Sequence, residues 1–196
     1  MILISVKNIF KRFRDKKVIN DFSFEFESGK CYAITGSNGQ GKTTLINLIL
    51  GLIYVNQGQI ELYTDRIVYV PDKVNLPGNA KVYEYLKTIG SVIGVNKRQL
   101  NHDLDILMKY WKLNEYQNFK IKNLSKGNKQ KILIIQALIG PSDIYIFDEA
   151  MNGLDMEFQQ KFIETIKRLK DNGKTVIVIT HQLQSFKSVI DQEITL

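Results

Sequence analysis

The chain has 196 residues, of which 44% are hydrophobic and 24% charged. This length and balance predict one compact globular domain and exclude a disordered tail or a repeat array. The longest hydrophobic runs, such as 132–135 and 176–179, are far shorter than the roughly 20 residues needed to cross a bilayer, so we expect no membrane span. The single cysteine, Cys31, excludes a disulfide framework and a cysteine-based metal site.

The net charge of +7 has three open interpretations: a nucleic-acid partner, an anionic membrane surface, or a lysine-rich face that is simply solvated. The densest basic run lies near the amino end, at residues 11–17. A membrane surface suits such a run, but its position does not decide the question. The first residues lack the apolar core and cleavage site of a signal peptide, so we expect a cytoplasmic protein.

Residues 2–34 alternate in the manner of short strands separated by turns. Phe22, Phe24 and Phe26 are spaced as on one face of a half-buried strand. The apolar segment 31–34 then leads into a glycine-rich loop over residues 36–44. A helix is predicted after the loop, with its apolar face formed by Leu45, Leu48, Ile49 and Leu52.

The second part of the chain alternates between strand and helix patterns. Strands are expected near residues 60–62 and 67–70. Over residues 81–139 the apolar residues recur with the spacing of a helix. One apolar face is formed by Val82, Leu86, Ile89 and Ile93, and another by Leu100, Leu104, Leu107 and Trp111. Buried parallel strands are predicted at 144–147 and 175–180, joined by a helix over 156–170 that ends before Gly173. The pattern predicts an α/β fold: a parallel core carrying a β layer and a helical subdomain.

The glycine-rich loop fits the phosphate-binding P-loop pattern in the strand–loop–helix context that the pattern requires. Glycines let successive backbone N–H groups point at phosphate oxygens, and the positive end of the following helix adds attraction. Lys42 is expected to reach the β- and γ-phosphates, Thr43 to ligate Mg²⁺, and Thr44 to contact the α-phosphate. The complete candidate set for the nucleotide phosphates is Gly36, Ser37, Asn38, Gly39, Gln40, Gly41, Lys42, Thr43 and Thr44.

Two adjacent acids, Asp148 and Glu149, follow an apolar strand at the end where ligands of open α/β sheets gather. Alone, such a pair is often a solvated turn. Beside a P-loop, we expect Asp148 to hold Mg²⁺ through water and Glu149 to polarise the attacking water as general base.

Further motifs make a family resemblance specific. Residues 124–131, Leu-Ser-Lys-Gly-Asn-Lys-Gln-Lys, resemble the LSGGQ signature of the ABC ATPases. Residues 152–155 are similar to that family's D-loop, and His181 is similar to its switch histidine. Phe13 falls where the family places an aromatic residue that stacks on adenine. The order of these motifs matches over essentially the whole chain.

The resemblance implies a P-loop NTPase core of ABC type with an N-terminal antiparallel β layer and an inserted helical subdomain. We expect a single ATPase domain over 1–196, with the β layer and core at 1–72 and 141–196 and the helical subdomain at about 73–140. It implies ATP and Mg²⁺ as cofactors, an integral-membrane permease as partner, and an ATP-dependent head-to-tail dimer with an identical or different second ATPase subunit. Such a subunit lies on the cytoplasmic face of the membrane.

The resemblance also assigns individual roles. Glu149 and His181 are the expected catalytic residues, and Asp155 belongs to the D-loop. The signature residues Ser125, Lys126, Gly127 and Asn128 are expected at the opposite subunit's ATP. Three of the assignments that the resemblance implies have a plainer alternative: Ser125 as an ordinary helix cap, His181 as a polar strand-end residue, and Phe13 as a core or edge-strand aromatic.

Three positions depart from the family pattern. Asp72 stands at the Q-loop glutamine, Ala150 at the proline after the catalytic acid, and Asn128 at the signature glutamine. Asp72 is therefore a candidate for the metal shell or for coupling to the permease. The ending at Leu196 leads us to expect shortened last strands.

The expected function is the ATP-hydrolysing subunit of an ABC transporter, of the kind found in bacterial efflux, bacteriocin or peptide export, or self-immunity. The alternative is a soluble ABC ATPase in cofactor assembly or on nucleic acid, supported only by the positive charge; no specific nucleic acid is expected. A nucleotide sensor without turnover is disfavoured because Glu149 and His181 are both present. The substrate and its direction of transport do not follow from the sequence.

Overall fold

The computed structural model describes residues 1–14 and 16–196 and divides into two compact units. The first, here called the sheet unit, comprises Met1–Ile67, Asp143–Asp148 and Ile163–Leu196. The second, the helical unit, comprises Val68–Ser142 and Glu149–Phe162. Asp15, in the basic run, lies outside the described residues.

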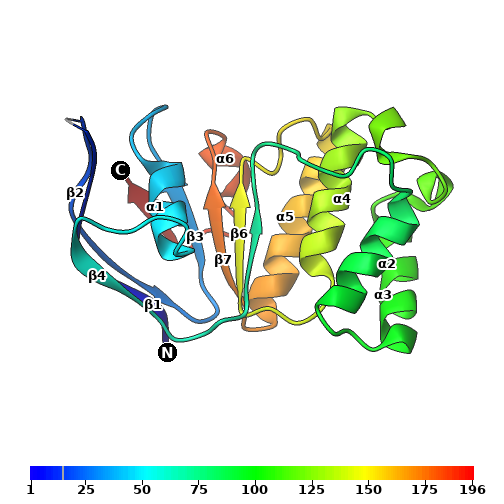
Figure 1. Cartoon of the computed structure of the whole chain (residues 1–196), viewed down its shortest axis with the longest axis horizontal. Coiled ribbons are helices and arrows are strands. Elements are labelled where there is room, and N and C mark those ends of the chain that lie inside the picture. The colour runs from blue at the N-terminus through cyan, green and yellow to red at the C-terminus, as the bar shows by residue number, and fades with distance from the viewer. Residues whose placement is uncertain (15) are drawn as a thin grey trace. The chain divides into compact units, whose positions relative to one another are not determined.

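An antiparallel sheet opens the sheet unit (Figure 1). It consists of β1 (Ile2–Phe13), β2 (Lys16–Glu27) and β4 (Gln57–Leu62), in the order β2-β1-β4. The expectation of short strands was wrong, because β1 and β2 each run for 12 residues. The turn-forming residues instead lie at irregularities within long strands. Asn8 and Asp21 have positive φ angles, and the Asn8 side chain donates to Asp21 at 3.0 Å.

The three phenylalanines of β2 confirm the predicted half-buried strand. Phe22 and Phe24 are partly buried and Phe26 is fully buried, while the residues between them are exposed. The rings of Phe24 and Phe26 pack edge-on against Tyr32, with centroids 5.5 and 5.0 Å away. These contacts join β2 to the strand that precedes the glycine-rich loop.

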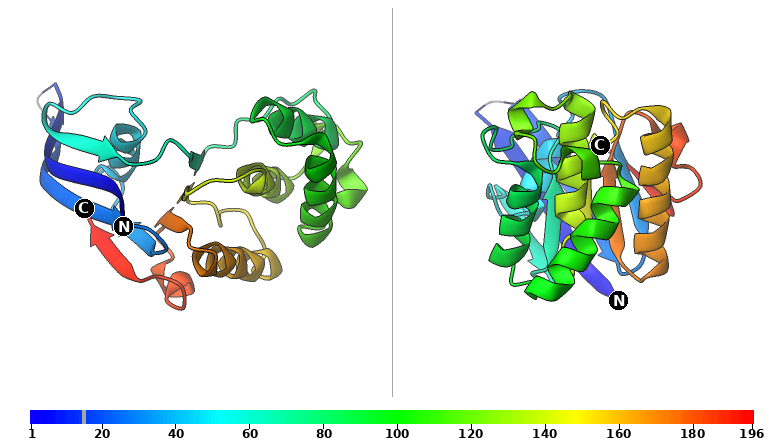
Figure 2. Two further views of the ribbon diagram at one scale, coloured as in Figure 1. Left: turned by 90° about the horizontal axis from the view of Figure 1, so that it is seen from below. Right: turned by 90° about the vertical axis from the view of Figure 1, so that its right-hand side faces the viewer.

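The parallel sheet of this unit contains β3 (Cys31–Thr35), β6 (Ile144–Asp148), β7 (Thr175–Ile179) and β8 (Gln192–Thr195), in the order β6-β7-β3-β8. Every residue of β6 and β7 is buried, which explains their continuous apolar sequence. Because the four strands are parallel, their carboxyl ends meet at one edge of the sheet. The chain begins in the antiparallel sheet and ends just after β8, the edge strand of the parallel sheet (Figures 1 and 2).

Helix α1 (Lys42–Ile49) follows the glycine-rich loop but is shorter than predicted. Leu45, Leu48 and Ile49 are buried as expected, whereas Leu52 lies beyond the helix and is 66% exposed. Gly51 has a φ of 68° and stops the helix in the left-handed conformation that favours glycine. The unit also contains the short helix α6 (Leu183–Phe186) and the second half of α5 (Met156–Asp171).

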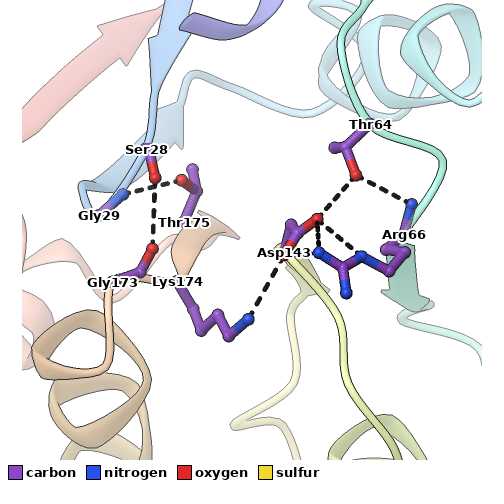
Figure 3. A network of polar contacts seen from close by, with 8 residues as sticks. All are labelled: Ser28, Gly29, Thr64, Arg66, Asp143, Gly173, Lys174 and Thr175. Carbon is purple, nitrogen blue, oxygen red and sulfur yellow. Dashed lines mark hydrogen bonds and ion pairs between the residues drawn. The ribbon is translucent and has the colours of Figure 1, made fainter. Parts of the chain in front are cut away.

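A polar network ties together the amino ends of the parallel strands (Figure 3). Asp143, just before β6, accepts hydrogen bonds from Thr64 at 2.8 Å and from Arg66 Nε and Nη2 at 2.9 Å. Lys174, just before β7, lies 3.4 Å from the same carboxylate. Ser28 and Gly29 bond to Gly173 and Thr175 alongside it. The network lies at the edge of the sheet opposite the glycine-rich loop.

In the helical unit, β5 (Ile67–Val70) leads in from the sheet unit and is followed by α2 (Val82–Val92) and α3 (Lys97–Tyr110). Two 3-10 turns (Asn114–Tyr116 and Ile121–Asn123) precede α4 (Lys126–Leu138). None of the described helices is long and apolar enough to span a membrane.

The predicted apolar face of α2 was correct at its start and wrong at its end. Val82 and Leu86 are buried, but the third buried position is Gly90, and Ile93 is 53% exposed. The Leu100 side chain of α3 occupies the space where a Cβ atom of Gly90 would lie. The missing side chain of a glycine, not a large apolar residue, therefore shapes this contact.

Candidate nucleotide-binding site

The glycine-rich loop connects β3 to α1 with several left-handed residues. Gly41 has a φ of 106°, and a Cβ atom there would lie 2.9 Å from Val18 Cγ1 and 3.0 Å from the Val18 carbonyl oxygen. Only glycine fits both the backbone angle and the space. Motif reasoning did not find Val18, because nothing local in the sequence shows that residue 18 packs against residue 41.

The Lys42 ammonium lies inside the loop. Its Nζ donates to the carbonyl oxygens of Gly36 and Ser37 at 2.7 and 3.1 Å, and the residue is only 8% exposed. The Gln40 side chain accepts a hydrogen bond from the Ser37 N–H and braces the same turn. The positive charge is thus held against two backbone carbonyl groups of the glycine-rich loop.

The same edge of the parallel sheet carries Asp148 and His181. Asp148 is the last residue of β6 and is 4% exposed, and it pairs in register with Ile179, the last residue of β7. Ile179 pairs in turn with Ile34, just before the loop, and His181 follows β7 by two residues. The sheet unit therefore brings the P-loop, the buried carboxylate and the histidine to neighbouring strand ends.

Phe13 ends β1 beside a basic pocket. Its ring is 47% exposed, and the Lys11 ammonium lies 5.0 Å from the ring centroid. The Asn56 side chain accepts from the Arg12 N–H at 2.8 Å, which ties the loop before β4 to β1. The pocket is lined by Phe10, Lys11, Arg12, Lys17, Ile19, Asn20, Asn56 and Gln57.

In the helical unit, Glu149 begins the segment that leads to the D-loop. Its φ of 51° is unusual for a non-glycine residue, and its carbonyl oxygen accepts from the Asn152 N–H at 2.9 Å. The Asn152 side chain is 3.5 Å from Asp72 Oδ1, at the limit of a hydrogen bond. Asp72 therefore lies beside the D-loop segment, and it also lines a pocket with Lys73, Val74, Lys126 and Lys129.

The signature segment forms the amino end of α4. Ser125 caps the helix as predicted, accepting from the Asn128 N–H at 3.2 Å. A Cβ atom at Gly127 would lie 2.5 Å from the Gly153 carbonyl oxygen, so the signature turn and the D-loop touch backbone to backbone. Asp155 has a capping role too, because its carboxylate accepts from the Phe158 N–H at 3.1 Å at the start of α5.

The chain matches the family model described as ABC transporter over residues 19–152. It is 37% identical to an ABC transporter ATP-binding protein of Methanocaldococcus jannaschii over 98% of this chain and 73% of that protein. It is 31% identical to the ABC transporter ATP-binding protein NatA of Bacillus subtilis, over 98% of this chain and 85% of that protein. The Nod factor export ATP-binding protein I of Burkholderia lata is 30% identical over 96% of this chain, which spans 66% of that relative.

A solved structure described as the ATP binding subunit of an ABC transporter superposes with a TM-score of 0.92 at 26% identity. The match covers 99% of this chain and 85% of that one. The predicted fold, a P-loop core with an antiparallel β layer and added helices, is confirmed. On these grounds the chain belongs to the ABC transporter family and is one of its ATP-binding ATPases.

Proposed function

We propose that this ATPase binds MgATP at the P-loop, hydrolyses it in a head-to-tail dimer, and drives export through a membrane permease. The observation that carries the nucleotide site is the Lys42 ammonium, which lies among the loop carbonyls at the carboxyl edge of the parallel sheet. Phosphate oxygens bind at this position because the N–H groups, the helix end and the ammonium all favour negative charge.

The residues beside the loop fit Mg²⁺. Thr43 is exposed at the start of α1. Asp148 is the last residue of β6, which β7 separates from the strand before the loop, and it lies at the same edge of the sheet. Mg²⁺ prefers oxygen ligands and takes one or two protein groups together with phosphate oxygens and water. Bound Mg²⁺ would neutralise part of the phosphate charge; Thr43 and Asp148 would hold it.

Glu149 is our proposed general base and His181 the residue that orients the γ-phosphate or the attacking water. The carboxylate accepts the water proton as the oxygen attacks, while the imidazole donates a hydrogen bond. Phe13 is proposed to stack on adenine, since its exposed ring ends a strand next to a pocket with three cationic side chains. The signature residues and Asp155 complete the partner subunit's site.

Trapping the dimer tests both hydrolysis and assembly. Glu149→Gln should bind ATP but stop turnover, because an amide cannot accept the water proton. ATP retained at the interface should then hold two subunits together in sedimentation with MgATP. The control is Lys42→Ala in the same background, which should neither bind MgATP tightly by calorimetry nor dimerise. A Glu149→Gln chain that stays monomeric and keeps full ATPase activity contradicts the base and the dimer.

Export is proposed because relatives over nearly the whole chain include Nod factor export proteins. Purification from detergent-solubilised membranes tests the partner class. A stable integral-membrane subunit supports the transporter, whereas recovery with only ribosomes, nucleic acid or assembly factors points to a soluble ABC ATPase.

Asp72 is proposed to act mainly in coupling to that permease and only secondarily in the metal shell. Its closeness to Asn152 connects it to the D-loop segment, and its pocket is rich in lysine. Asp72→Asn should leave MgATP affinity of the isolated subunit within roughly tenfold, about 1.4 kcal/mol, and lower the stimulation of ATPase activity by the permease. Loss of magnesium-dependent binding with unaltered stimulation would make Asp72 a metal-site residue.

A further inference from the structure

One face of α4 makes two contacts one helical turn apart, the first with the D-loop and the second with the first turn of α5. Gly127 meets the Gly153 backbone, as described above. Four residues further along, Lys131 places its ammonium 3.0 Å from the centroid of the Phe158 ring. Residues four apart lie on the same side of a helix, so both contacts belong to a single face.

Lys131 is unusual for a lysine because it is only 7% exposed. Burial lowers its pKa, while the carboxylates of Asp155 and Glu157 act in the opposite direction. Glu157 already has two partners, since ion pairs with Lys112 at 2.8 Å and Lys161 at 3.0 Å lower its pKa to about 2. Of the two carboxylates, Asp155 has the larger raising effect on the pKa of Lys131.

Stability alone gives little reason for a lysine at this position. Desolvating an ammonium is costly, and an apolar side chain of similar length often serves a core equally well. Phe158 lies in the first turn of α5, and Asp155 accepts from its N–H. The charge of Lys131 therefore acts on two groups: the Phe158 ring in the first turn of α5 and the carboxylate of Asp155, the last residue of the D-loop.

We propose that Lys131 is a positioning residue that holds the D-loop against the signature turn, so that both approach the partner subunit's ATP as one surface. This inference rests on the proposed head-to-tail dimer. The ammonium fixes Phe158 through its ring and Asp155 through its charge, while the Gly127–Gly153 contact sets the spacing.

The decisive variant is Lys131→Met, which keeps length and an attractive contact with the ring but removes the charge. Hydrogen exchange of the isolated subunit should show faster exchange at the Phe158 amide of α5, by about tenfold, with no change in α4. In the Glu149→Gln background, the dissociation constant of the ATP-bound dimer should rise about tenfold or more, while MgATP affinity of the monomer stays within about twofold. Lys131→Arg should restore both values.

Lys112→Met is the matched control, because Lys112 belongs to the same cluster but its side chain is 61% exposed and 6.0 Å from the ring centroid. It should leave dimerisation unchanged. Thermal unfolding separates positioning from a purely structural role: Lys131→Met should keep the melting temperature within about 2 °C, as expected when a buried charge is replaced by an apolar isostere.

If hydrogen exchange at the Phe158 amide is the same in Lys131→Met as in the unaltered chain, the role of the Lys131–Phe158 contact is overturned, regardless of the dimerisation result. Faster exchange with unaltered dimerisation overturns the positioning role. The positioning role is also overturned if Lys131→Met lowers both the melting temperature and dimerisation and Lys131→Arg restores neither. Failure of the proposed function would look different, because the Glu149→Gln chain with Lys131 intact would then form no ATP-dependent dimer. Hydrogen exchange at Phe158 would still show whether Lys131 holds the start of α5.

Discussion

At the scale of single residues, Gly127 shows why a signature glycine is required in this chain. Its neighbour is a backbone carbonyl, which cannot rotate away as a side chain would. Gly127→Ala should therefore displace the D-loop and weaken the ATP-bound dimer of the Glu149→Gln chain by about tenfold, roughly 1.4 kcal/mol. Sedimentation measures the dimer, and calorimetry should find normal MgATP binding in the monomer. Normal dimerisation of Gly127→Ala would mean that the backbones of residues 127 and 153 can move apart without weakening the dimer.

Cys31 gives a second prediction at this scale. The thiol is fully buried, and burial raises its pKa from 9.0 to about 12. At pH 8 the thiolate fraction falls roughly a thousandfold, so iodoacetamide should modify the folded chain far more slowly than the chain in urea. Mass spectrometry follows the reaction. Equal rates in the two states would contradict the burial of β3.

At the scale of elements, the contact between α2 and α3 depends on Gly90. Gly90→Ala improves helix propensity by about 1 kcal/mol but places a methyl group into Leu100, which is 1% exposed and closely packed. Overpacking costs about 1–3 kcal/mol, so we expect net destabilisation in urea unfolding. Ser91→Ala, on the exposed neighbouring position, should be close to neutral. A more stable Gly90→Ala chain would show that Leu100 repacks freely.

The elements differed in how well local sequence predicted them. The buried strands β6 and β7 and the helix α5 agree with their apolar patterns, because burial imposes the period directly. The length of β1 and β2 was not predictable, since residues such as Asn8 and Asp21 suit turns as well as bulges. The end of α1 was missed because Leu52 continues the helical period beyond Gly51.

At the scale of the whole molecule, the motif residues were predictable because each lies in a short local pattern. The contacts that position them were not. Asn152 beside Asp72 and Lys131 over Phe158 join residues far apart in the chain, and no local pattern marks either pair. Local sequence patterns indicate the candidate site residues, while long-range packing decides which of them contact one another.

The network around Asp143 should make the stability of the folded chain depend on pH in the acid range. Burial alone would raise the pKa of Asp143, but hydrogen bonds from Thr64, Arg66 and Lys174 outweigh it and hold the pKa below 3.8. A lowered carboxyl pKa in the folded state stabilises the protein above the ordinary pKa, and this stabilisation is lost as pH falls through the lowered value.

Asp143→Asn keeps the shape of the side chain and removes the charge that pairs with Arg66 and Lys174. The variant should melt at a lower temperature than the unaltered chain at pH 7. The difference should narrow as pH falls through the lowered pKa of Asp143, where the unaltered carboxylate itself becomes protonated. Circular dichroism melting at several pH values measures this, with Asp105→Asn on the exposed side of α3 as the control. A difference that is constant with pH would mean that packing, not the charge of Asp143, joins the amino ends of β6 and β7.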